Sequence, residues 1–133
     1  MRQVEFGDLI LRWVASDLWT VYEDFAVFID GNPIYVPKGF STDLASIPKF
    51  LWPILSPMGP YTPAAVLHDY LYATQPCPKE KADEMFRDAM LCLNVDTAIA
   101  EKIYKAVKDY GHSAWGGHSA RLSTGVVTPK EIA

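Results

Sequence analysis

The sequence is short of cysteine, of basic residues and of long apolar runs, and each shortage excludes a class of protein. Cys77 and Cys92 are the two cysteines among 133 residues. They are too few for a disulfide framework or a zinc site, so we expect both to be small buried hydrophobes. The 12 basic residues are outnumbered by 16 acidic ones and are scattered, which argues against binding to nucleic acid. No stretch approaches the roughly 18 apolar residues of a membrane span.

The opening residues, MRQVEFGDLI, contain no apolar run of signal-peptide length. We therefore expect the chain to stay in the cytoplasm of the cell that makes it, unless it leaves inside a larger particle. Half of the residues are hydrophobic, which is enough for one core. We expect a single domain over residues 1–115, followed by a loosely docked C-terminal tail over residues 116–133.

The pattern along the chain predicts an α+β fold. In residues 1–36, apolar segments of strand length alternate with the turn sequences ASD and DGN, which favours a small antiparallel β-meander. Residues 37–61 form a connector whose five prolines break regular structure. Its many large apolar residues argue against disorder, so we expect it to be packed down.

Residues 62–111 have the features of three helices. Thr62 is expected to cap the first helix, with Pro63 in its first turn and an end near residue 74. The segment KEKADEMFRDAMLCLNV carries a helical apolar face and predicts the second helix. Residues 96–110 predict the third, which Gly111 ends. The glycine-rich and serine-rich remainder, with His112 and His118, is expected to be tail.

The first helix carries two ionisable residues in the apolar stretch AAVLHDYLYA. His68 shares a helix face with Ala64 and Leu71 and should point inward. Asp69 is rotated from it by about 100°. The two side chains therefore cannot make the same contact, but they can flank one water or ion.

The second helix carries a carboxylate on its apolar stripe, because Asp83 lies in line with Phe86 and Met90. A buried carboxylate is costly unless something pairs with it. The short QPCP link makes the two helices antiparallel neighbours, so His68 is the nearest candidate partner. A carboxylate bonded to one imidazole nitrogen leaves the other nitrogen free to act as a base.

A third carboxylate follows in the connector segment GFSTDLASIP. Asp43 and Asp69, with nearby carbonyl oxygens, would suit a calcium ion, which takes oxygen ligands in loose geometry. Each residue also has a structural interpretation. His68 and Asp69 can fill a polar gap, Asp83 can tie helices or pair with Lys79 or Lys81, and Asp43 can hold an Asx turn.

Two resemblances add to this pattern. The segments GFSTDLASIP, AAVLHDYLYA, KADEMFRDAM and YKAVKDYGHSAW resemble, in order, a family of small proteins of unknown function from tailed bacteriophages and prophages. This resemblance implies a viral origin, with the host cytoplasm or the virion as the location and other phage proteins as partners. It implies no activity.

The second resemblance concerns chemistry. LHDYLY followed by ADEMFRD is similar to the helix pair of secretory phospholipases of the A-two class, especially the compact bacterial ones. It implies His68 as the base that activates water, Asp83 as the acid that orients it and Tyr72 as a supporting side chain. It also implies Asp69 as a calcium ligand, with Asp43 and the carbonyl of Leu44 in place of a calcium-binding loop.

Two hypotheses for function follow. In one, the chain is a phage-type protein with a calcium-assisted hydrolase site, with lipid or other acyl esters as the first substrates to test. In the other, it is a non-catalytic virion or tail component, or a factor acting on the host, and the same residues are structural.

Overall fold

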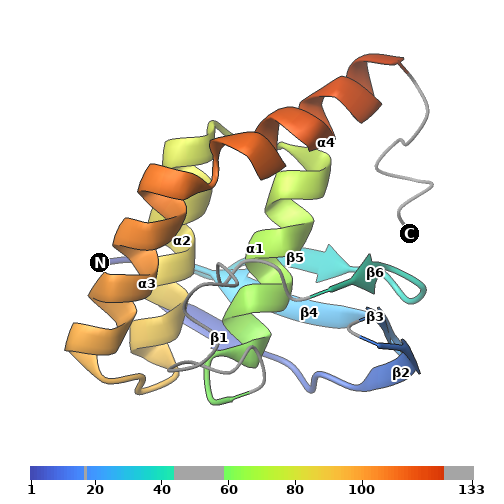
Figure 1. The fold of residues 1–133 in the computed structure, drawn as a ribbon. Coiled ribbons are helices and arrows are strands. Elements are labelled where there is room, and N and C mark those ends of the chain that lie inside the picture. The colour runs from blue at the N-terminus through green and yellow to red at the C-terminus, as the bar shows by residue number, and fades with distance from the viewer. Residues whose placement is uncertain (17, 44–58, 125–133) are drawn as a thin grey trace.

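Two small antiparallel sheets precede a group of helices (Figure 1). A computed structural model of the chain describes residues 1–16, 18–43 and 59–124, with side chains described as far as residue 119. The predicted α+β class is confirmed. The strands are β1 (Val4–Phe6), β2 (Leu11–Ala15), β3 (Leu18–Val21), β4 (Phe25–Ile29), β5 (Asn32–Val36) and β6 (Ser41–Thr42).

The strands do not form the single meander that the turn sequences suggested. One sheet has the order β1-β4-β5 and the other β2-β3-β6. Both predicted hairpins are present, and Asp30 and Gly31 turn the β4–β5 hairpin with positive φ angles, as a two-residue turn requires. The difference arises because β1 pairs with β4 and β6 pairs with β3. Such long-range pairing depends on burial rather than on turns.

The three expected helices are present, with ends close to those predicted, and a fourth follows them. They are α1 (Thr62–Thr74), α2 (Lys79–Cys92), α3 (Thr97–Tyr110) and α4 (His112–Thr124). The cap position of α1 falls on Tyr61, one residue before the expected cap Thr62, and Tyr61 makes no side-chain cap bond. The Thr62 hydroxyl accepts a hydrogen bond from the backbone N–H of Gly59, at 2.8 Å.

Helix α4 replaces the first part of the expected tail. Glycine and serine give it weak helix propensity, but tertiary contacts hold it. The ring of Trp115 packs edge-on against Tyr72, and the Gln75 amide donates to the Trp115 carbonyl. The Ser119 hydroxyl donates in turn to Gln75. Residues 125–133 of the expected tail lie outside the described residues.

The core lies between the β1-β4-β5 sheet and the helices. Helix α2 contacts both α1 and α3, and it also contacts β1 (Figure 1). Among the described residues, no helix is long and apolar enough to cross a membrane. The largest fully buried apolar side chains are Val21 of β3, Phe25 and Val27 of β4, Val36 of β5, Leu67 and Leu71 of α1, Phe86 and Met90 of α2, and Ile103 of α3.

The expected packing of the connector can be followed only at its ends. Phe40 and Tyr61 are both buried in the core. The part of the connector from 44 to 58, which includes Leu44, lies outside the described residues.

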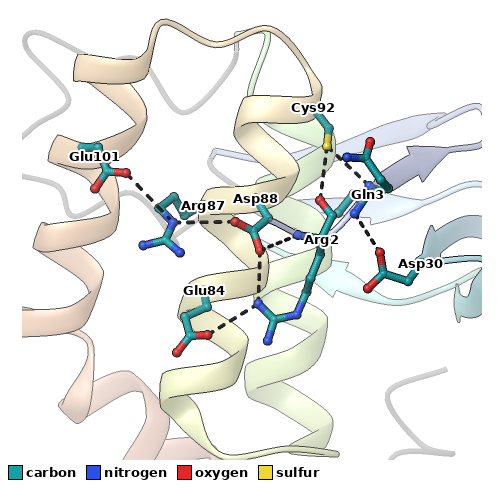
Figure 2. Close-up of polar contacts among 9 residues, drawn as sticks. Arg2, Gln3, Asp30, Glu84, Arg87, Asp88, Cys92 and Glu101 are labelled. Atoms are coloured by element: carbon teal, nitrogen blue, oxygen red, sulfur yellow. Dashed lines mark hydrogen bonds and ion pairs between the residues drawn. The ribbon is translucent and has the colours of Figure 1, made fainter.

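Polar contacts that the sequence pattern does not indicate fasten the N-terminus to α2 (Figure 2). Buried Asp88 accepts hydrogen bonds from the backbone N–H of Arg2 at 3.3 Å and from its guanidinium at 3.1 Å. The Cys92 sulfur accepts from the Val4 N–H at 3.4 Å. Cys92 and Cys77 are free thiols that pack against the core, but they are half-buried rather than buried as was expected.

The start of α3 provides a test of local stability. The Asp96 carboxylate accepts hydrogen bonds from the backbone N–H groups of Ala98 and Ile99. Asp96→Ala should lower the free energy of unfolding by about 1 kcal/mol, because these helix N–H groups lose their cap. Chemical denaturation measures the loss. Asp109→Ala, an exposed change near the other end of α3, is the control and should change stability by less than about 0.5 kcal/mol.

Candidate functional site

The Asp83 carboxylate receives hydrogen bonds from three side chains. His68 Nε2 lies 2.7 Å from Oδ1, the Tyr72 hydroxyl donates to the same oxygen at 2.7 Å, and Lys79 Nζ donates to Oδ2 at 2.7 Å. Asp83 and His68 are each 1% exposed. The polar cluster of His68, Tyr72, Lys79 and Asp83 is therefore mostly buried, and Lys79 is its partly exposed member, with a side chain that is 11% exposed. We call this cluster the Asp83 network.

Helical spacing brings these groups together. Tyr72 follows His68 by one turn on α1, and Lys79 precedes Asp83 by one turn on α2, so each pair lies on one helix face. The short link between α1 and α2 places the two faces against each other. The predicted contact between His68 and Asp83 is confirmed. The alternative partner Lys79 binds the same carboxylate, so the two possibilities occur together.

The charges in the network follow from burial and hydrogen bonding. Burial alone would raise the pKa of Asp83, but the bonds from His68, Lys79 and Tyr72 outweigh it and hold this pKa below its ordinary value. Burial lowers the pKa of His68, although Asp83 opposes the shift. His68 is thus neutral beside an ionised carboxylate. Because a carboxylate only accepts, Nε2 carries the proton, and Nδ1 is the basic nitrogen of the ring.

Aromatic rings surround the imidazole. Phe86 stacks on His68 with ring centroids 4.4 Å apart, and the Tyr72 ring is tilted against it at 4.3 Å. Burial, followed by the charge and hydrogen bond of Asp83, raises the pKa of Tyr72, so its hydroxyl stays protonated. These contacts fix the plane of the imidazole and the direction of its bond to Asp83.

The junction of α3 and α4 closes the network from the other side. Lys79 Nζ also donates to the carbonyls of Val107 at 3.0 Å and Lys108 at 3.3 Å. A Cβ atom added to Gly111 would lie 2.7 Å from the Tyr72 hydroxyl and 2.4 Å from the Val107 carbonyl. Position 111 therefore requires glycine because a side chain there would clash with these two atoms. This adds to the role at the end of the third helix that the sequence indicated. His112 is exposed and outside this network.

Asp69 faces a different neighbour, as its position on the helix predicted. The Thr42 hydroxyl of β6 donates a hydrogen bond to Asp69 Oδ2. Burial raises the pKa of Asp69 to about 7; the bond from Thr42 opposes this shift and the nearby charge of Asp43 adds to it. Asp69 and Asp43 are thus close enough to interact electrostatically.

The Asp69 region has ligand atoms of the type that calcium prefers, but few of them. Two carboxylates and a threonine hydroxyl supply oxygens, whereas calcium takes six to eight. Within residues 1–16, 18–43 and 59–124, no group of three or more His, Cys, Asp or Glu residues is placed to hold a metal ion. The carbonyl of Leu44, the further ligand implied by the resemblance, lies outside these residues.

The fold and the network define an α+β domain with a buried histidine–aspartate pair. The chain belongs to the family described as protein of unknown function (DUF1353), which matches residues 19–107. The match includes the Asp83 network, Asp69 and Asp43, whereas β1, β2 and α4 lie outside it. Neither a curated protein nor a solved structure matches the chain.

The raised pKa of Asp69 predicts a pH-dependent effect of its replacement. Between about pH 4 and pH 7, the folded protein holds a proton on Asp69 that the unfolded chain has lost, so this group adds stability as the pH falls. Above pH 7 that contribution is absent. The stability of Asp69→Asn relative to wild type should therefore be higher at pH 8 than at pH 5.

Urea denaturation of both proteins from pH 5 to pH 8 measures this difference. His68 is present in both proteins, so its own contribution cancels. A difference that does not change with pH would show that Asp69 does not titrate in this range.

Proposed function

We propose that the chain is a hydrolase of acyl esters in which His68 is the general base and Asp83 is its orienting acid. The observation that carries the proposal is the 2.7 Å bond between His68 Nε2 and the Asp83 carboxylate. Because Asp83 accepts the hydrogen bond from Nε2–H, the other ring nitrogen, Nδ1, can accept a proton from water. A neutral ring at pH 7 is in the correct state to do so.

The other residues support the same chemistry. Tyr72 holds Asp83 in place, and Lys79 keeps it ionised. Asp69 and Asp43, with the carbonyl of Leu44, would hold a calcium ion. Such an ion would polarise the ester carbonyl. The raised pKa of Asp69 supports this assignment, since a cation would relieve the cost of an ionised carboxylate beside Asp43.

A second candidate function is favoured by a separate observation. His68 is 1% exposed and stacks on Phe86, so a substrate would have to displace protein atoms to reach the ring. In this alternative the protein is a non-catalytic phage component, acting in the virion or the host cytoplasm and bound to other phage proteins. The Asp83 network then serves to hold α1, α2 and α3 together.

The first test is ester hydrolysis. The wild type should cleave p-nitrophenyl butyrate, and His68→Gln should lower kcat/KM by about 100-fold or more, because a general base contributes about this factor. The wild-type rate should fall only at a pH below the ordinary pKa of histidine, because burial lowers the pKa of His68 and the protonated ring cannot act as the base. His112→Gln changes an exposed histidine and should keep full activity.

Two results would decide against the hydrolase. One is a wild type without esterase activity in the presence of calcium. The other is a His68→Gln protein that keeps both its far-UV circular dichroism and its activity.

The cation is tested separately by thermal unfolding. Saturating calcium should raise the melting temperature of the wild type by roughly 3 °C or more, since a ligand that binds only the folded state stabilises it. Asp69→Ala should lose this rise, and Asp109→Ala, which removes an exposed carboxylate, should keep it. No response in the wild type, or equal responses in wild type and Asp69→Ala, would contradict the proposed cation site.

A further inference from the structure

Helix α4 is held by fewer buried side chains than the other helices. Each of α1, α2 and α3 contributes fully buried residues, whereas none of the described side chains of α4 is fully buried. Two consecutive glycines, Gly116 and Gly117, also weaken the helix itself, because glycine has a low helix propensity. The side chains of α4 that are half-buried are Trp115, His118 and Ser119.

The attachment of α4 to the rest of the protein is centred on Trp115. Figure 1 shows α4 crossing the C-terminal end of α1, and the two helices are in contact. The Trp115 ring packs edge-on against Tyr72, with ring centroids 5.1 Å apart. The Gln75 amide donates to the Trp115 carbonyl at 2.9 Å and accepts from the Ser119 hydroxyl at 2.8 Å. Loss of the Trp115 contact would therefore weaken the docking of α4 on α1.

The chain is firmly held before Gly111 and weakly held after it. Lys79 Nζ binds the carbonyls of Val107 and Lys108, so α3 is fixed up to its last turn. Gly111 ends α3, and α4 begins at the next residue. Hinges in proteins are often small residues at the ends of helices or strands. Gly111 is thus placed to let α4 turn while α3 stays in position.

The surface beneath α4 includes the ring that contacts the imidazole. Tyr72 packs against Trp115 on one helix and against His68 on the other, and its hydroxyl binds Asp83. His68 is 1% exposed, so a ligand cannot reach its ring while these side chains stay packed. Release of Trp115 would uncover Tyr72, the immediate neighbour of the imidazole.

We propose that α4 is a lid over the Asp83 network, which turns about Gly111, is held closed by Trp115 and opens to admit a ligand to His68. The assignment of that ligand as an acyl ester rests on the proposed function, whereas the opening of the lid does not. The burial of His68 is then a property of the closed state. Folded proteins open locally where few side chains are buried, and lids over buried sites use such openings.

Modification of histidine by diethyl pyrocarbonate tests the proposal in the full chain. At pH 7 the reagent attacks an imidazole nitrogen that it can reach, and peptide mass spectrometry gives the rate at each histidine. Exposed His112 is the reference within the same molecule. Trp115→Ala should raise the rate at His68 relative to His112 about tenfold, because an aromatic contact contributes roughly this factor to an equilibrium.

Two variants serve as controls for this measurement. Trp115→Phe keeps an aromatic ring against Tyr72 and should modify His68 at close to the wild-type rate. Trp13→Ala removes a tryptophan that is 59% exposed on β2 and should also leave the rate unchanged. An unchanged rate in Trp115→Ala, or an equal increase in Trp13→Ala, would overturn the proposal.

Hydrogen exchange of the wild type keeps the lid testable if Trp115→Ala fails to fold. Amides of α4 should exchange at least about tenfold faster than those of α3, because α4 opens without global unfolding. In a folded Trp115→Ala protein, exchange should become faster in α4 and stay slow in α3. Wild-type α4 amides that are as protected as those of α3 would rule out a lid.

The lid and the hydrolase can fail separately. Faster modification of His68 in Trp115→Ala, with no esterase activity in either protein, would support the lid and contradict the hydrolase. Esterase activity that depends on His68, with the same modification rate in wild type and Trp115→Ala, would overturn the lid alone.

Discussion

The arrangement of the helices depends on one buried, ionised carboxylate. An isolated charge at the position of Asp83 would cost several kcal/mol in an apolar interior. Three donors remove that penalty: His68 and Tyr72 from α1, and Lys79 from α2 itself. Lys79 also binds carbonyls at the end of α3. The need to satisfy one side chain thereby sets how three helices meet.

The same burial affects the neighbouring titratable groups in a consistent way. It lowers the pKa of His68 and raises that of Asp69, so both side chains are driven toward their neutral forms. Asp83 differs because hydrogen bonds from three side chains, one of them the Lys79 cation, favour its charged form. A neutral imidazole held by an ionised acid is what general-base catalysis requires, and it is equally a stable way to join helices. The two proposed functions differ in what they require of His68. A general base must be reached by its substrate, whereas a residue that joins helices can stay buried.

Polar contacts also join each sheet to a helix. The Thr42 hydroxyl in the β2-β3-β6 sheet binds Asp69 on α1. Arg2, just before β1, binds Asp88 on α2 (Figure 2). The sheets and helices are thus connected by buried carboxylates as well as by the apolar core.

Local patterns in the sequence determined the positions of α1, α2 and α3, the inward direction of His68 and its pairing with Asp83. Each depends on helical periodicity or on a short link, both of which can be followed along the chain. Only the tertiary structure decided the pairing of β1 with β4, the close approach at Gly111 and the formation of α4. These features join residues far apart in sequence. Their energies come from burial and contact in three dimensions, which neither periodicity nor propensity contains.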